Sequence, residues 1–92
     1  MRENPEDGAL LNRLSGVRYS QGDYREAAEL LERSLKIEAE NPDALFGLGM
    51  CSVGMGRAGE ARRYFTQARE LYRKIKSLSG VEQAEGELGK LR

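Results

Sequence analysis

Two stretches of the chain, LSGVRYSQGDYREAAELLERS at residues 14–34 and LGMCSVGMGRAGEARRYFTQA at residues 48–68, follow one pattern. A shift of 34 residues places leucine on leucine at the start of the stretch, glycine on glycine near its middle and alanine on alanine after it. A repeat of this period predicts one helix-turn-helix unit used twice. Over the wider chain the matched pairs are Leu11/Leu45, Leu14/Leu48, Ser15/Gly49, Gly22/Gly56, Glu26/Glu60, Ala27/Ala61, Leu31/Phe65, Ser34/Ala68 and Ile37/Leu71.

Apolar residues at helical spacing, together with capping residues, predict the first two helices. The first runs from about residue 5 to residue 20, with Asn4 as its N-cap, and Gly22 ends it. The second begins at Asp23, and Glu26 follows at the spacing of a capping box. The apolar positions that indicate the first helix are Leu10, Leu11, Leu14 and Val17, and the expected buried stripe of the second is Ala27, Leu30, Leu31, Ser34, Leu35 and Ile37.

Three more helices are expected, which makes the chain all-α with about five helices. Asn41 and Pro42 form a cap-plus-proline start for the third. The last spans about residues 79–91 and opens on a capping box of Ser79 and Glu82. The apolar positions are Leu45, Leu48 and Val53 in the third helix, Ala61, Tyr64, Phe65, Ala68, Leu71, Tyr72 and Ile75 in the fourth, and Val81, Ala84, Leu88 and Leu91 in the fifth.

The composition restricts the chemistry that the chain can perform. Its 92 residues suit one small domain, and its formal net charge of zero gives no reason to expect a polyanionic partner. Histidine is absent from the sequence, which removes the usual general base and the commonest zinc ligand. We therefore expect a protein that is not an enzyme and that holds neither a metal nor a cofactor.

The single cysteine and the apolar pattern indicate a compartment. One cysteine, Cys51, excludes an internal disulfide, and its helical neighbours Leu48 and Met55 indicate a packing role rather than a reactive thiol. No apolar run approaches the roughly 20 residues that cross a bilayer, and the polar start MRENPEDG lacks the apolar core of a signal peptide. We expect a cytoplasmic protein with no membrane partner.

The stretch GLGMCSVGMG at residues 47–56 holds four glycines. A phosphate-binding loop of the GxxxxGK[ST] type requires a preceding strand, and Met55 and Gly56 stand where its Lys and Ser or Thr belong. The spacing also differs from the GxGxxG of dinucleotide-binding folds. We therefore interpret the stretch as a packed helix, in which Gly49 lets a neighbouring helix approach and Gly56 ends the helix. The pattern assigns no role to the other two glycines.

These features together resemble the tetratricopeptide repeat. The family pattern has an aromatic residue where Arg18 and Ser52 stand here, and a closing proline where Ala39 and Arg73 stand. The residues that carry the resemblance are Leu11, Leu14, Ser15, Tyr19, Gly22, Asp23, Tyr24, Ala27, Leu31 and Ser34 in the first repeat, and Leu45, Leu48, Gly49, Gly56, Ala61, Phe65 and Ala68 in the second.

The resemblance implies one domain over residues 1–92, built as an α-solenoid of antiparallel helix pairs. Repeat one covers about residues 8–41, repeat two about residues 42–75, and a C-terminal capping helix about residues 79–91. The first helix of each pair would line a concave groove that binds a peptide or a partner helix. The groove positions carried over to this chain are Asn12, Arg13, Gly16, Tyr19, Asp43, Phe46, Met50 and Val53.

The expected function is a non-enzymatic protein–protein interaction module whose partner is a protein or a peptide. Some members of the family hold a terminal carboxylate of a chaperone with a clamp of Lys, Asn and Arg. Asn12, Gly16 and Gly47 stand at clamp positions in this chain, so we do not expect that role. Phe46 and Met50 have a second interpretation as core residues beneath the last helix.

Two other functional hypotheses stay open. Two repeats and a helix fall short of the roughly three repeats that a solenoid usually needs. The chain is therefore either part of a longer array or a unit completed by self-association as a homo-oligomer. A basic stripe of Arg62, Arg69, Arg73 and Lys76 raises contact with nucleic acid. Zero net charge favours a solvated face instead, and we do not expect a nucleic-acid partner.

Overall fold

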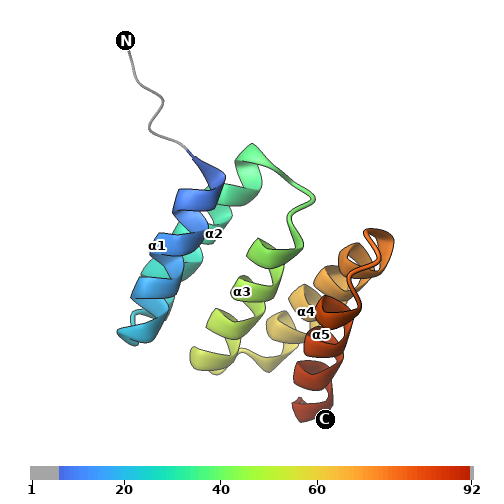
Figure 1. Cartoon of the computed structure of the whole chain (residues 1–92). Helices are drawn as coiled ribbons and strands as arrows, with labels where there is room; N and C mark the ends of the chain where they lie inside the picture. Colours follow the sequence, from blue (N-terminus) through green and yellow to red (C-terminus); the bar gives the residue numbers. More distant parts are fainter. Residues whose placement is uncertain (1–6, 92) are drawn as a thin grey trace.

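The computed structural model describes residues 7–91, which form five α-helices and no strand (Figure 1). This confirms the predicted all-α helical repeat. α2 packs against α1 and α3, and α4 packs against α3 and α5. None of the described helices is both long enough and apolar enough to cross a membrane. The helices are α1 (Gly8–Ser20), α2 (Tyr24–Ile37), α3 (Pro42–Gly54), α4 (Ala58–Lys74) and α5 (Leu78–Lys90).

Two helix starts agree with the sequence and two correct it. Asp23 caps α2 and Asn41 caps α3, each by accepting a hydrogen bond from the third residue after it. α1 begins at Gly8, because the Asp7 carboxylate accepts from the amides of Ala9 and Leu10. Asn4, the predicted cap, lies outside the described residues.

The cap of α5 is also displaced from its predicted place. Ser77, and not Ser79, accepts a hydrogen bond from the Gly80 amide, so α5 begins at Leu78. The reason is the tight turn that precedes it, in which Lys76 takes a left-handed backbone conformation with φ of 63°. This turn leaves Ser77 in extended geometry at the helix entrance, where its hydroxyl reaches the first turn.

The turns within the two repeats use glycine for the same conformation. Gly22 and Gly56 have φ of 80° and 76°, a region that costs a residue with a Cβ atom about 1–2 kcal/mol. In both turns the residue after the glycine donates its amide to a carbonyl four residues before the glycine, from Asp23 to Arg18 and from Arg57 to Ser52. The two repeats therefore turn in the same way.

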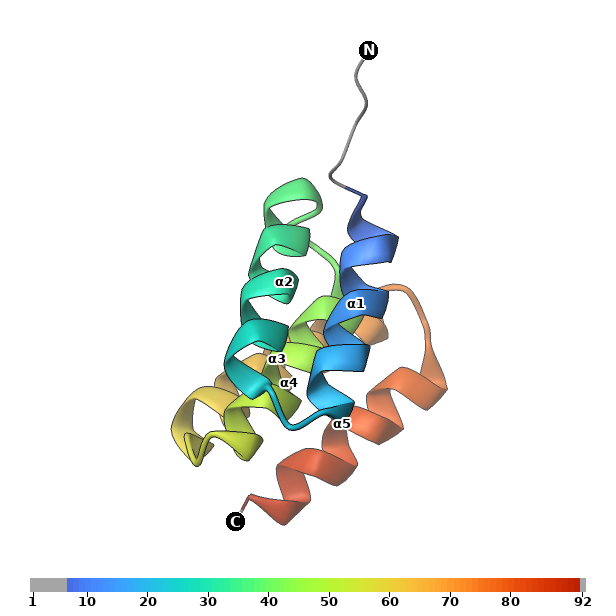
Figure 2. The same ribbon diagram turned by 90° about the vertical axis from the view of Figure 1, so that its left-hand side faces the viewer.

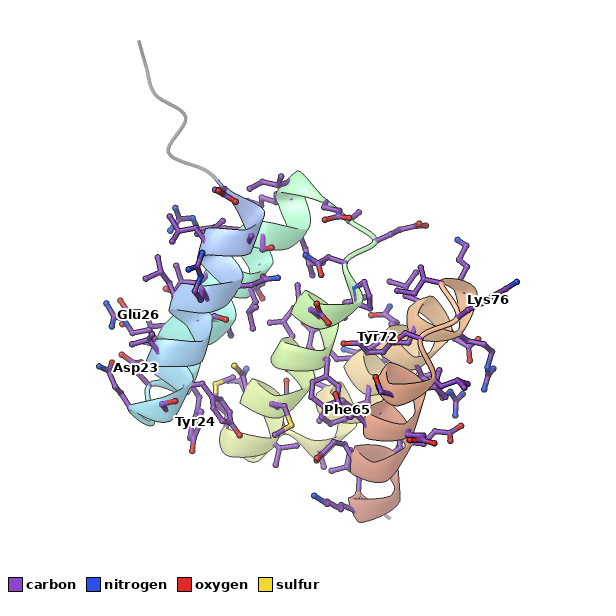
Figure 3. The ribbon with its side chains drawn as sticks, in the orientation of Figure 1. Asp23, Tyr24, Glu26, Phe65, Tyr72 and Lys76 are labelled. Atoms are coloured by element: carbon purple, nitrogen blue, oxygen red, sulfur yellow. The ribbon has the colours of Figure 1, made fainter. Side chains whose placement is uncertain are left out.

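Three glycines of α3 receive side chains from both neighbouring helices. A Cβ atom on Gly49 would lie 2.6 Å from the Phe65 ring of α4, which is fully buried. Cβ atoms on Gly47 and Gly54 would lie 2.8 Å from Leu31 and from the Tyr24 ring, both on α2. Figure 3 shows Tyr24 at the C-terminal end of α3 and Phe65 along its side. Close helix packing thus explains the glycine-rich stretch, including the two glycines without a predicted role.

The core lies mainly on both sides of α3. One buried cluster joins α2 to α3, and a second joins α3 to α4. α5 closes the far side of α4, where the Tyr72 ring packs directly on Gly80. The members of the first cluster are Ala27, Leu31, Ala44, Leu48 and Cys51, and those of the second are Leu45, Ala68 and Tyr72.

Several residues expected in the apolar stripes are exposed. On α1 only Leu11 and Ser15 are buried, because α2 covers one side of this helix and its outer side faces solvent. Ile37 and Ile75 are exposed at the last turn or end of their helices. Figure 2 shows α1 and α2 side by side at the near end of the stack, with α3 and α4 behind them. Ile37, which was expected in the buried stripe of the second helix, is exposed and corrects that prediction. The other exposed apolar positions are Leu10, Leu14, Val17, Val53 and Ile75.

Candidate functional site

α1, α3 and α5 lie on one side of the molecule, and α2 and α4 lie behind them (Figure 1). We call this side the α1/α3/α5 face. The predicted groove residues come from the first two of these helices. They are Asn12, Arg13, Gly16 and Tyr19 on α1, and Asp43, Phe46, Met50 and Val53 on α3.

A hollow of about 170 Å³ lies between α1 and α3. Gly16 and Tyr19 line it on α1, and Met50 lines it on α3. It is also lined by two residues of the buried cluster between α2 and α3, Leu31 and Cys51. Three predicted groove residues thus border one concavity, whereas the other five lie outside its lining. Ser15 and Gly47 complete the lining.

Tyr19 packs against one aromatic ring, and its pKa is raised by its surroundings. Its ring packs edge-on against Tyr24, with ring centroids 5.2 Å apart and planes at 61°. Burial raises the pKa of the Tyr19 hydroxyl, and the nearby Tyr24, Cys51 and Glu87 raise it further. Glu87 belongs to α5 and forms an ion pair with Lys90 at 3.3 Å. The pKa of Tyr19 therefore depends on a residue of α5 as well as on residues of the two repeats.

Phe46 is half-buried, and part of its ring packs against the core. Its centroid lies 5.2 Å from that of Phe65, and it packs against the cluster that joins α3 to α4. Met50 is also half-buried, but it lines the hollow. The core interpretation and the groove interpretation therefore each describe part of this surface.

Asp43 has a partner within the fold. The Tyr72 hydroxyl donates a hydrogen bond of 2.5 Å to the Asp43 Oδ1 atom, which ties the first turn of α3 to α4. Burial raises the pKa of Tyr72, and this hydrogen bond to a carboxylate raises it further. The Asp43 carboxylate is thus already committed to an internal contact.

The remaining predicted groove residues differ in what they offer. The Oδ1 atom of Asn12 is buried, and no hydrogen-bond partner for it exists among the described residues. Arg13 is exposed, and within residues 7–91 it forms no ion pair. Val53 is 43% exposed near the end of α3. Arg13 and Val53 are therefore both accessible to a partner.

The three arginines of the basic stripe lie on α4 and are largely occupied by contacts within the protein, whereas Lys76 lies in the turn after this helix and does not continue the stripe. Arg62 donates to the Leu91 carbonyl oxygen at 3.0 Å, and Arg69 pairs with Glu70 at 3.2 Å. Arg73 pairs with Glu70 at 3.3 Å and with Glu85 of α5 at 3.8 Å. These contacts place acidic groups among the arginines and favour the interpretation of the stripe as a solvated face.

Cys51 is 1% exposed, and burial raises the pKa of its thiol to about 11. A thiol of that pKa holds almost no nucleophilic thiolate at neutral pH. The packing role that the sequence indicates for this cysteine therefore agrees with its environment.

The lining of the hollow includes residues that sequence analysis did not select. Ser15 and Leu31 belong to the repeat pattern and read as core positions in the sequence. They reach the hollow because Gly16 and Gly47 have no side chains to cover them. In the sequence, the missing side chains of Gly16 and Gly47 are the only indication that Ser15 and Leu31 border a hollow.

Comparisons with known proteins agree with the fold. A family model described as "Tetratricopeptide repeat" matches residues 18–79. Cellulose synthase 1 operon protein C of Komagataeibacter xylinus is 37% identical over 65 residues, and cellulose synthase operon protein C of the same organism is 35% identical over 65 residues. Each match covers 70% of this chain, but the chain spans only 5% of the length of these relatives.

A solved structure is similar over almost the whole chain. The solution structure of a tetratricopeptide repeat domain protein from Salinibacter ruber matches with a TM-score of 0.84 and 18% sequence identity. The match covers 98% of this chain and 91% of that one. At 18% sequence identity, this likeness shows a shared fold and nothing beyond it.

Proposed function

The chain belongs to the tetratricopeptide-repeat family, and on this premise we propose that it is a non-enzymatic interaction module that binds a protein or peptide on its α1/α3/α5 face. Repeat proteins of this architecture use extended concave surfaces for binding. The observation that carries the proposal is the apolar hollow between α1 and α3, bordered by Gly16, Tyr19 and Met50. Adaptable apolar side chains such as Met50 suit a surface that accepts a peptide or an amphipathic helix.

Groove residues with free side chains extend this surface beyond the hollow. Val53 is exposed on α3, and Arg13 is exposed on α1. Phe46 contributes the part of its ring that does not pack against Phe65. A partner that spans these positions meets apolar surface on α3 and a cation on α1.

A selection from a randomised nonapeptide library, performed on the immobilised chain, tests this proposal. Peptides that bind should lose affinity with Val53→Glu, because an added carboxylate on the α1/α3/α5 face opposes apolar contact. Ile75→Glu is the matched control, since Ile75 is also exposed but is the C-cap of α4, a helix that lies behind that face. Equal binding by both variants, or no selected peptide at all, would argue against a binding site on this face.

Self-association is a second candidate, because exposed apolar residues line one side of α1. Leu10, Leu14 and Val17 are 43%, 40% and 47% exposed and lie at helical spacing. A second copy that covers this stripe would bury it as α2 buries α3. Light scattering behind a sizing column, over a wide range of protein concentration, distinguishes a monomer from such an assembly. Leu14→Glu should restore the monomer if the stripe is the contact.

A further inference from the structure

The hollow between α1 and α3 has the size of one side chain. Its volume is about 170 Å³, and a cavity of about 150 Å³ is large enough to hold benzene. Its lining offers few polar groups. The Ser15 hydroxyl already donates to the Asn12 carbonyl oxygen at 2.6 Å, and the Cys51 thiol is a weak donor. The space therefore suits an apolar group.

Gly16 borders the hollow and has open space beside it. A Cβ atom on Gly16 would meet no other atom within 4 Å, whereas one on Gly47 would lie 2.8 Å from Leu31. Leu31 thus occupies the space beside Gly47, and α1 leaves the space beside Gly16 open. A Cβ atom introduced at Gly16 would enter open space at the border of the hollow.

The charges around the hollow leave one cation without an acidic partner. Glu87 on α5 acts on Tyr19 but is paired with Lys90, and Asp43 accepts the hydrogen bond of Tyr72. Arg13 lies one helical turn before Gly16, is exposed, and has no ion pair within residues 7–91. This part of the face therefore complements a negative charge on a partner.

We propose that the hollow receives one aliphatic side chain, of the size of Leu, Ile or Met, from a partner polypeptide, and that Arg13 pairs with a carboxylate of the same segment. This inference rests on the proposed function and adds the chemistry of the bound segment. The aliphatic side chain replaces water in an apolar space, which supplies affinity. The carboxylate sets the position of the segment along α1.

The nonapeptide library supplies the first measurement. The selected sequences should share one Leu, Ile or Met, with Asp or Glu within four positions of it. Selected peptides that lack an aliphatic residue, or that carry Lys or Arg in place of the acid, would overturn the inference while leaving the proposed function intact.

Gly16→Leu is the decisive variant, because Gly16 borders the hollow and the substitution adds an aliphatic side chain at that border. The selected peptide should bind about tenfold more weakly or worse, which is the loss expected when one aliphatic side chain loses its burial. Gly59→Leu on α4 is the matched control, since a Cβ atom there also meets nothing within 4 Å. Undiminished binding by Gly16→Leu, with binding still lost in Val53→Glu, would refute the pocket and keep the α1/α3/α5 face as the site.

Arg13→Glu tests the charged contact separately. Binding of the acidic peptide should weaken about three- to fivefold at low salt, and the matching peptide with Lys in place of the acid should bind more tightly than before. A preference for the acidic peptide that persists in Arg13→Glu would exclude Arg13 as its partner.

The methionine methyl groups provide a direct reading of the site in solution. Met50 lines the hollow, whereas Met55 lines a different cavity together with residues of α2 and α4. In the chain labelled with 13C at the methionine methyls, the selected peptide should shift the Met50 signal and leave the Met55 signal in place. The reverse pattern would place the aliphatic side chain elsewhere. Absence of binding by every library peptide would count against the proposed function itself.

Discussion

α1 and α3 hold the same place in successive repeats, yet they differ in how deeply they are buried. Leu10, Leu14 and Val17 of α1 are each at least 40% exposed. Their counterparts 34 residues later, Ala44, Leu48 and Cys51, are at most 2% exposed. The pattern is nearly the same, so the difference comes from the neighbours, because α3 is packed between α2 and α4 whereas α1 packs mainly against α2.

The two helices also differ in where they carry glycine. At the counterparts of Gly47, Gly49 and Gly54, where α3 admits side chains from its neighbours, α1 carries Arg13, Ser15 and Ser20. Ser15 and Leu31, the counterparts of Gly49 and Phe65, both line the hollow between α1 and α3. The helix packed on two sides thus carries glycine where its neighbours enter, and α1 carries larger residues at the same positions.

Truncating the same leucine in both helices tests this comparison most strongly. Leu48→Ala should lower the free energy of unfolding by about 2–5 kcal/mol, because it leaves a cavity in the core. Leu14→Ala should cost less than about 1 kcal/mol, since that side chain is already 40% exposed. Urea denaturation of the two variants measures both values. An equal cost that grows with protein concentration would mean that a second copy covers α1.

Raising the pH should destabilise the core around α3 through the thiol of Cys51, because the counterpart of Cys51 on α1 is Val17, which does not titrate. Burial raises the pKa of Cys51 from its ordinary value near 9 to about 11, so the unfolded chain releases this proton first. The folded state therefore binds more protons between these pH values, and its stability falls as pH rises. The expected loss is about 2 kcal/mol between pH 9 and pH 11.

Cys51→Ala is the control for this pH dependence. It removes the thiol and should remove the part of the loss that begins near pH 9. A loss that begins near pH 10 should persist, because the pKa of Tyr72 is also raised by burial and by its hydrogen bond to Asp43. Denaturation curves that decline equally in both proteins would show that Cys51 is solvated and that the α3 core is looser than the structure indicates.

Adding a methyl group to a glycine should have opposite effects in the two helices. Gly49→Ala brings a Cβ atom against the Phe65 ring and should cost about 1–2 kcal/mol even after its gain in helix propensity. Gly16→Ala meets open space and should stabilise α1 by up to about 1 kcal/mol. In a background of Phe65→Leu, which copies the smaller residue of repeat one, Gly49→Ala should become neutral or stabilising. Thermal unfolding of these variants measures the coupling.

Sequence analysis predicted the helices well because helix formation depends on local spacing. The 34-residue match and the caps at Asp23 and Asn41 identified both repeats. The two wrong caps each lie within three residues of the true one, where more than one residue has a capping side chain. The geometry of the preceding turn decides between such residues, and this geometry is not visible in the composition of the turn.

Burial and the candidate site were harder to predict, since both depend on what lies beside a helix. The stripe on α1 has the same apolar spacing as a buried one, so spacing alone predicts burial for Leu14 and Val17. The hollow depends on Leu31, whose side chain reaches it only because Gly47 leaves room. The pattern places residues on a helix face, but the contacts across two helices determine which of them border a cavity.

The turn between α4 and α5 can be compared with the turns that follow α1 and α3. Gly22 and Gly56 adopt left-handed conformations after α1 and α3, and Lys76 adopts one after α4, with its amide donating to Arg73 and the next amide donating to Tyr72. Lys76 pays a steric penalty that glycine avoids, so Lys76→Gly should raise the free energy of unfolding by about 0.5–1 kcal/mol. Gly56→Ala, the matched variant in a repeat turn, should lower it by a similar amount. If Lys76→Gly destabilises the protein instead, the side chain of Lys76 contributes more than its backbone costs, and the α4–α5 turn is built differently from the turns of the two repeats.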